Sequence, residues 1–193
     1  MSKFNPMRVV TLLSGAVVPF LPGAAVAQDS PMYVSCEYRF AVISPGQPRT
    51  RDIAYTTRGG ATAPAREFSF GSGSDRFAVT VAVFSAGPAV DDQIVEHAAE
   101  QLRQRGEVRF QAAAPYDPGM PGRQLNVFES NGRQLRASVY MADRRLTITE
   151  ASAAVGDFPA LQFEQSITLI DANGDDLDRP NNNQEPRNFG CRR

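Results

Sequence analysis

The chain has 193 residues, of which 42% are hydrophobic and 21% are charged, and this composition excludes a wholly disordered protein. The formal net charge of −1 excludes the large positive surplus that general nucleic-acid and anionic-membrane binding proteins carry. His97 is the only histidine, which excludes a zinc site built from several histidines.

The first segment has the features of an export signal. Lys3 and Arg8 give it a basic start, and the apolar run Val9–Val18 is too short to cross about 30 Å of hydrocarbon as a helix. Ala25-Val26-Ala27 offers the small residues after which signal peptidase cuts. We therefore predict a cleaved signal peptide over residues 1–27, a periplasmic or secreted location, and no membrane insertion after cleavage.

The two cysteines lie near opposite ends of the remaining chain, at Cys36 and Cys191. In an oxidising compartment an even number of cysteines favours a disulfide, and here it would hold a polar tail, 171–193, against a domain spanning 28–170. Two free thiols and a disulfide-linked dimer are the alternatives.

The region before residue 90 shows the alternation of half-buried strands. Met32–Val42 is predicted as one continuous strand with Cys36 on its inner face, and Arg58–Ala65 as a loop. Arg76–Ser85 is apolar on both faces, which predicts a central strand covered on both sides. The other strands predicted in this region are Arg51–Thr57 and Arg66–Phe70.

The hydrophobic period then changes to that of a helix. Pro88, Asp91 and Asp92 mark its start, and apolar residues from Val90 to Leu102 recur at helical spacing. Gly106 is predicted to end this helix. A strand is expected next, over Glu107–Ala114.

A three-strand meander follows. Asn131-Gly132 is a strong hairpin signal between the first two strands, and Asp143-Arg144 connects the second to the third. A short helix over Phe158–Ser166 is expected to bury Phe158 and Leu161, with Phe163 as a further candidate. The three strands of the meander are Arg123–Ser130, Arg133–Ala142 and Arg145–Ala151. The order of elements predicts an α+β fold, a mostly antiparallel sheet with one long and one short helix packed on it.

Two short motifs add a resemblance to this order. Pro121-Gly122-Arg123 opens the meander and Phe163-Glu-Gln-Ser166 lies in the last helix, and together with the element order they resemble the PsbP-like α/β/α sandwich family. Arg145-Leu-Thr-Ile departs from that pattern, because relatives often carry an aromatic residue after the leucine. The resemblance implies a non-enzymatic accessory or binding domain, and it carries over no photosynthetic role and no site residue.

Hydrolysis is the enzymatic alternative. His97 is the one side chain with a neutral-range pKa for acid–base work, but no Gly-x-Ser-x-Gly elbow accompanies it. The alternative to a catalytic role is that His97 is an ordinary, half-exposed histidine on the helix surface. A pair of carboxylates is the other catalytic candidate, although no two acidic residues have a sequence spacing that indicates a catalytic pair. The acids considered are Glu37, Glu67, Glu129 and Glu150.

The acidic run that begins at Asp171 suggests a calcium site, and the sequence predicts no other cofactor. Asp171, Asn173 and Asp175 place oxygen ligands at alternating positions, as Ca²⁺ sites do. The run departs from an EF-hand loop, with Asp176 at position six and Asn182 at position twelve. A solvated acidic turn is the alternative to a calcium-stabilised domain.

Arginines of the meander are the candidate ligand-binding residues. Arginine pairs bidentately with carboxylates and phosphates, so a sheet face carrying them could bind a small acidic ligand or an acidic protein. A solvated face balanced by cross-strand acids is the alternative. The residues predicted for this face are Arg133, Arg136, Tyr140 and Arg145. The sequence thus favours an exported binding or accessory module without catalytic activity, whose partner it does not identify.

Overall fold

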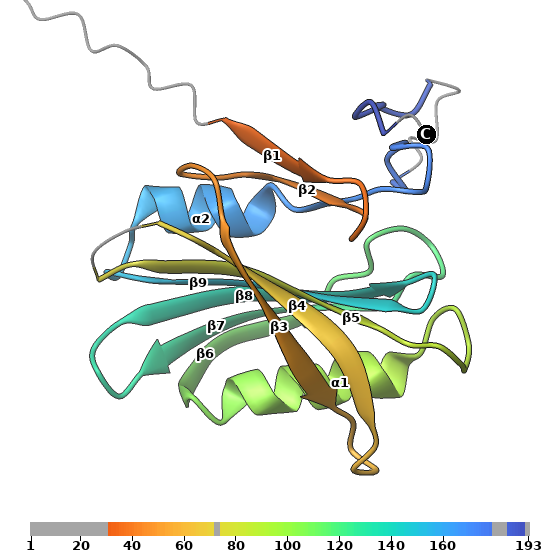
Figure 1. Cartoon of the computed structure of the whole chain (residues 1–193). Coiled ribbons are helices and arrows are strands. Elements are labelled where there is room, and N and C mark those ends of the chain that lie inside the picture. Colours follow the sequence, from red (N-terminus) through yellow and green to blue (C-terminus); the bar gives the residue numbers. More distant parts are fainter. Residues whose placement is uncertain (1–30, 72–73, 179–184, 192–193) are drawn as a thin grey trace, which may run out of the picture.

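The computed structural model describes residues 31–71, 74–178 and 185–191, and the predicted signal peptide lies outside them. The fold is α+β, with a seven-stranded and a three-stranded sheet, both antiparallel, and two short helices packed on them (Figure 1). Among the described residues no helix is both long and apolar enough to cross a membrane.

The large sheet has the strand order β3-β4-β5-β9-β8-β7-β6. The predicted meander forms its β9-β8-β7 part, and the Asn131-Gly132 turn is confirmed, with Gly132 at a φ of 80°. The strands are β3 (Arg49–Thr56), β4 (Thr62–Phe70), β5 (Arg76–Val83), β6 (Gly106–Ala113), β7 (Gly122–Glu129), β8 (Gln134–Ala142) and β9 (Arg145–Ala153).

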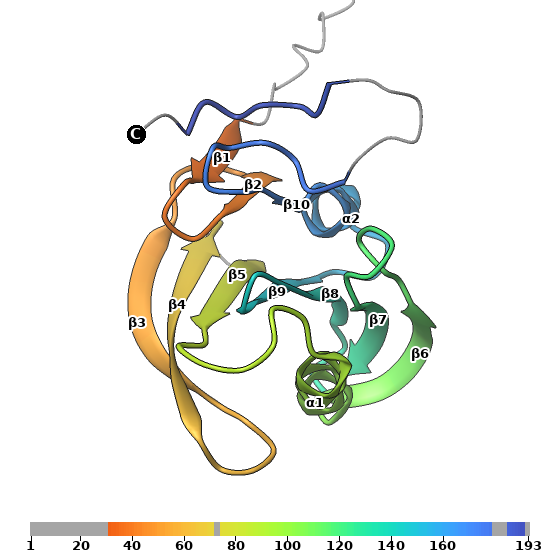
Figure 2. The same ribbon diagram turned by 90° about the vertical axis from the view of Figure 1, so that its right-hand side faces the viewer.

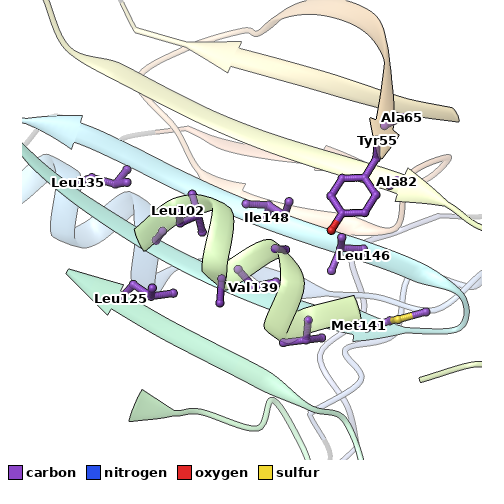
Figure 3. Close-up of a cluster of buried hydrophobic side chains, with 14 of the residues drawn as sticks. Tyr55, Ala65, Ala82, Leu102, Leu125, Leu135, Val139, Met141, Leu146 and Ile148 are labelled. Carbon is purple, nitrogen blue, oxygen red and sulfur yellow. The ribbon is translucent and has the colours of Figure 1, made fainter. Parts of the chain in front are cut away.

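Helix α1 (Asp92–Arg103) covers one face of the large sheet. The carboxylate of Asp91 caps its first turn by accepting a hydrogen bond from the amide of Gln93. Its buried side chains include Val95 and Leu102, which join a core cluster with inward residues of β7, β8 and β9 (Figure 3). The predicted helix stripe is therefore confirmed from Val95 to Leu102, whereas Val90 lies before the helix and is exposed.

The opposite face is covered by α2 (Phe158–Gln165) and the small sheet β1-β2-β10, so the large sheet is the middle layer (Figure 2). The small sheet consists of β1 (Met32–Ser35), β2 (Phe40–Ile43) and β10 (Thr168–Leu169). Phe40, Phe68 and Phe163 lie in the core cluster of this second interface. Because both faces of the large sheet are covered, β5 is buried on both sides, as its sequence predicts.

The prediction of one strand over Met32–Val42 is wrong. β1 ends at Ser35 and β2 begins at Phe40, and the two pair as an antiparallel hairpin. The amide of Tyr38 donates to the hydroxyl of Ser35 inside the turn, and Arg39 takes a φ of 60° there. Cys36 consequently lies in a turn and not on a strand face.

Two other boundaries differ from the sequence prediction. β4 begins at Thr62, inside the segment predicted as a loop, because Thr62 to Ala65 pair with β3. α1 ends at Arg103, and Gly106 is the first residue of β6. A Cβ on Gly106 would lie 2.1 Å from the carbonyl oxygen of Phe128, so the glycine permits close strand pairing and does not cap the helix.

The prediction that α2 buries Phe158 is wrong, whereas Phe163, the further candidate, is buried. Phe158 is 67% exposed, whereas Phe163 is 2% exposed and packs on Phe70 and Phe77. Phe158 stands at the first helical position, directly after the capping residue Asp157, and projects beyond the interface.

The predicted disulfide is confirmed. Cys36 and Cys191 are bonded, with their Cα atoms 5.4 Å apart and 155 positions between them in sequence. The bond attaches the last described segment to the β1–β2 turn (Figure 1).

Candidate functional site

Three separate segments meet around a hollow of about 150 Å³ at one end of the sheets. They are the β1–β2 turn, the β8–β9 turn, and the chain that follows β10. We call this feature the Arg39–Arg145 hollow. Its lining residues are Arg39, Ala142, Asp143, Arg145, Thr147, Leu169, Ile170, Asp171 and Leu177.

Two guanidinium groups converge on one carboxylate at this hollow. Arg39 Nη1 and Arg145 Nη1 both donate to Oδ2 of Asp143, the latter at 2.9 Å. Arg145 Nη1 also lies 3.2 Å from the carbonyl oxygen of Asp143. Both arginine side chains are largely buried, at 24% and 21% exposure for Arg39 and Arg145. The arrangement concentrates positive charge at a partly desolvated position.

Asp143 does not fully compensate the charge of Arg145. Burial, followed by repulsion from Arg39, lowers the pKa of Arg145 from its ordinary value, even though Asp143 opposes the shift. The Nε atom of Arg145 is buried and has no hydrogen-bond partner among the described residues. An unpaired buried donor on a cation is costly, so this group favours an anionic acceptor.

Backbone conformation is also unusual at this site. Among the described residues, the non-glycine positions with positive φ are Arg39, Asp143 and Arg144. Such conformations cost energy for residues with a Cβ and persist where surrounding contacts hold them. The carbonyl of Arg39 accepts from the amide of Ile170, and the amide of Arg144 donates to the carbonyl of Ala89. These bonds hold both turns in place beside the hollow.

The inner surface of the hollow is apolar. Ala142, Leu169 and Ile170 are buried, and Thr147 is buried with them. Leu177, from the segment after β10, also lines the hollow. The amide of Leu177 donates a hydrogen bond to the carbonyl of Leu169. The charged groups therefore stand beside a hydrocarbon floor.

The disulfide supports one wall of the hollow. Cys36 lies three positions before Arg39, and its partner Cys191 packs directly against Gly174, between Asp171 and Leu177. A Cβ on Gly174 would approach the amide nitrogen of Cys191 to 2.8 Å, and its φ is 89°. One covalent bond thus joins two of the three segments that form the hollow.

Only one of the four predicted ligand-binding residues lies at this hollow, and that residue is Arg145. Arg133 is at the opposite end of the β8–β9 hairpin, where it donates to Asp75 and to the carbonyl of Ser152. Arg136 and Tyr140 share the predicted face with Ser138, but α2 packs over it, so the face does not point outward. Glu164 of α2 is buried there and accepts a hydrogen bond from Ser138.

Sequence reasoning missed Arg39 and Asp143. A continuous strand over Met32–Val42 would put Arg39 on the face opposite Cys36, and the Asp143-Arg144 turn carries no predicted role. The turn itself was a usable signal, because a two-residue β8–β9 connection requires positive φ at Asp143 and Arg144. Nothing in the sequence pairs this turn with Arg39.

The acidic run predicted for calcium forms a hydrogen-bonded turn. Oδ1 of Asp171 accepts from the amides of Asn173 and Asp175, and Asp175 accepts from the side chain of Asn188. Across residues 31–71, 74–178 and 185–191, no group of three histidine, cysteine or acidic residues could hold a metal ion. Calcium binding by Asp171, Asn173 and Asp175 stays a prediction.

His97 lies on α1 among partners that do not resemble a hydrolase triad. Its Nε2 is within 3.3 Å of the carbonyl oxygen of Thr56 and 3.2 Å of the Gln101 amide, and Glu100 approaches Nδ1 at 3.9 Å. No serine is among its hydrogen-bond partners in the part of the chain that the structure describes.

Two of the candidate acidic residues, Glu129 and Glu150, share one arginine partner in the structure. Glu129 and Glu150 both pair with Arg105, at 2.6 and 3.1 Å, and Glu129 also accepts from Ser152. Coulombic attraction to both acids helps to raise the pKa of Arg105 against the opposing effect of its burial. The shared guanidinium makes this an ion-pair network, in which both acids are held as acceptors.

Comparison with known proteins does not assign the chain to a family, because no family model matches it and no curated protein matches it. The resemblance to the PsbP-like family stays a prediction.

Proposed function

We propose that this protein is an exported binding or accessory module that holds an acidic ligand at the Arg39–Arg145 hollow. The observation that carries the proposal is the buried Nε of Arg145, which has no acceptor among the described residues and belongs to a guanidinium beside a second one. Arginine binds a carboxylate through two parallel N–H donors, and Asp143 engages Nη1 of Arg145. Nη1 is thus occupied, and Nε is the donor of this guanidinium that lacks an acceptor among the described residues.

A binding role suits the chemistry of these groups better than a catalytic one. Guanidinium groups stay protonated in proteins, so Arg39 and Arg145 neither accept nor release a proton near neutral pH. Asp143 already accepts hydrogen bonds from both guanidinium groups, which occupy its Oδ2 atom. The site therefore offers charge and shape to a ligand without an evident proton-transfer group.

Location and family form the second part of the proposal. The Cys36–Cys191 disulfide supports an oxidising compartment, in agreement with the predicted signal over residues 1–27. A sheet covered by α1 on one face and by α2 on the other supports the PsbP-like sandwich inferred from element order. We propose a periplasmic or secreted accessory protein of this architecture.

Thermal unfolding in the presence of anions tests the binding role. The disulfide-bonded protein should gain melting temperature with increasing sodium acetate, because a ligand that binds only the folded state stabilises it. Arg145→Gln should remove most of this gain. Arg109→Gln, which removes the same charge from an exposed strand position, should retain it and controls for general salt effects. Equal responses of the two variants would contradict the proposal.

A further inference from the structure

The charges around the Arg39–Arg145 hollow indicate how many charges a ligand should carry. Arg39 and Arg145 are the basic residues of its lining. Asp143 and Asp171 are the acidic residues of the lining. The two cations and two carboxylates of the lining balance in formal charge, so a ligand should bring no more than one negative charge to pair with the N–H of Arg145 that lacks an acceptor among the described residues. A dianion would leave an excess negative charge at a partly desolvated position.

The floor of the hollow indicates the rest of the ligand. Ala142, Leu169 and Ile170 present hydrocarbon and no hydrogen-bonding side chain, and Leu177 continues this surface. A ligand made only of polar atoms, such as sulfate or phosphate, would leave this floor in contact with its own oxygens or with water. A hydrocarbon chain gains free energy there in proportion to the apolar area that it covers.

The volume limits the length of that chain. The hollow measures about 150 Å³, and a water molecule takes about 30 Å³ in the liquid, so roughly five water-sized groups fit. Covalently bonded atoms lie closer together than separate water molecules, so an ion of two carboxylate oxygens and about four carbons fills about this volume. Butyrate is an acid of this size.

We propose, on the basis of the binding role above, that the ligand of this hollow is a short aliphatic monocarboxylate. Its carboxylate accepts from the Nε edge of Arg145, beside the Arg39 guanidinium, and its hydrocarbon chain lies on Leu169, Ile170 and Leu177. Specificity comes from the combination of one charge with a short apolar chain.

Isothermal titration of the full disulfide-bonded protein with acetate, butyrate, sulfate, butylammonium and N-acetylvaline tests this ligand class. Two additional methylene groups on an apolar floor should make butyrate bind about tenfold more tightly than acetate. Sulfate should bind more weakly than butyrate, and butylammonium, which matches the chain but reverses the charge, should not bind. Leu177→Ala should lower the butyrate-to-acetate ratio of affinities by removing part of the floor.

The outcomes separate the ligand class from the binding role. If sulfate binds as tightly as butyrate and chain length has no effect, the aliphatic ligand is wrong while the anion-binding role stands. Tighter binding of N-acetylvaline than of butyrate would contradict a free acid and indicate the end of a peptide chain. If none of the anions binds, the proposed function itself fails.

Discussion

Arg39 and Asp143 form an ion pair between positions 104 residues apart in the sequence, and both take a positive φ. The pair connects the β1–β2 turn of the small sheet to the β8–β9 turn of the large sheet. Arg145 completes the contact from the adjacent strand. The candidate site is therefore a product of the packing between the two sheets and lies in neither of them alone.

Asp143 places a negative charge beside the donor that a ligand would use, so its charge should weaken anion binding. Asp143→Asn removes that charge, and asparagine tolerates the positive φ of 45° at this position. We expect the variant to bind butyrate severalfold more tightly than the natural protein, as measured by titration calorimetry. Weaker binding would show that Asp143 is needed to orient Arg39 and Arg145.

The disulfide should contribute much of the stability. Joining residues 155 positions apart restricts the unfolded chain, which is worth up to about 5 kcal/mol in the chain-entropy model. Reduction, or the double change Cys36→Ser and Cys191→Ser, should lower the melting temperature by roughly 10–20 °C. The reduced natural protein and the double variant should agree. A shift below a few degrees would contradict this role.

The two phenylalanines of α2 provide a matched test of how the helix packs. Phe163 is 2% exposed and contacts Phe70 and Phe77, whereas Phe158 is 67% exposed. Phe163→Ala should lower the free energy of unfolding by about 3–5 kcal/mol. Phe158→Ala, the same chemical change on the same helix, should stay within about 0.5 kcal/mol. Urea denaturation of both variants checks the difference, and equal losses would place α2 differently on the sheet.

Glu96 should make stability depend on pH. Hydrogen bonding to Arg103 lowers the pKa of Glu96 from its usual value of 4.5, burial opposes this, and Arg123 adds to the lowering. Because the folded-state pKa lies below the unfolded one, the stabilisation is complete above about pH 4.5 and is lost as the pH falls through the lowered value.

The variant Glu96→Gln isolates this contribution. It should be less stable than the natural protein by about 1 kcal/mol at pH 7. The difference should shrink as the pH falls from 4.5 towards 3 in urea denaturation experiments. A difference that is constant with pH would mean that Glu96 contributes through packing and not through its charge.

Local signals in the sequence were sufficient for much of the fold. The period of α1, the Asn131-Gly132 turn and the two-sided apolar pattern of β5 each reflect a rule that acts within a few residues, and each is confirmed. The Met32–Val42 prediction failed because Phe40 and Val42 continue the alternation of β1 in phase across the turn. A hairpin without a glycine or proline leaves little trace in such a pattern.

The site was less accessible from the sequence because its geometry depends on distant segments. Arg145 was identified as an arginine of the meander, but its partner Arg39 comes from another sheet. The hollow also needs Leu177, which the disulfide-attached tail supplies. The arginines of the meander led to the prediction of anion binding. Only the tertiary structure shows that Arg145 lies beside Arg39.

The most direct measurement follows the Nε–H signal of Arg145 in ¹H–¹⁵N nuclear magnetic resonance spectra while butyrate is added to the disulfide-bonded protein. The signal is assigned by its disappearance in Arg145→Lys. Our account predicts that it shifts in a saturable manner, with the same dissociation constant that calorimetry gives, while the Nε–H signal of Arg109 does not move. A stationary Arg145 signal at butyrate concentrations that saturate the protein would contradict a binding role for this arginine.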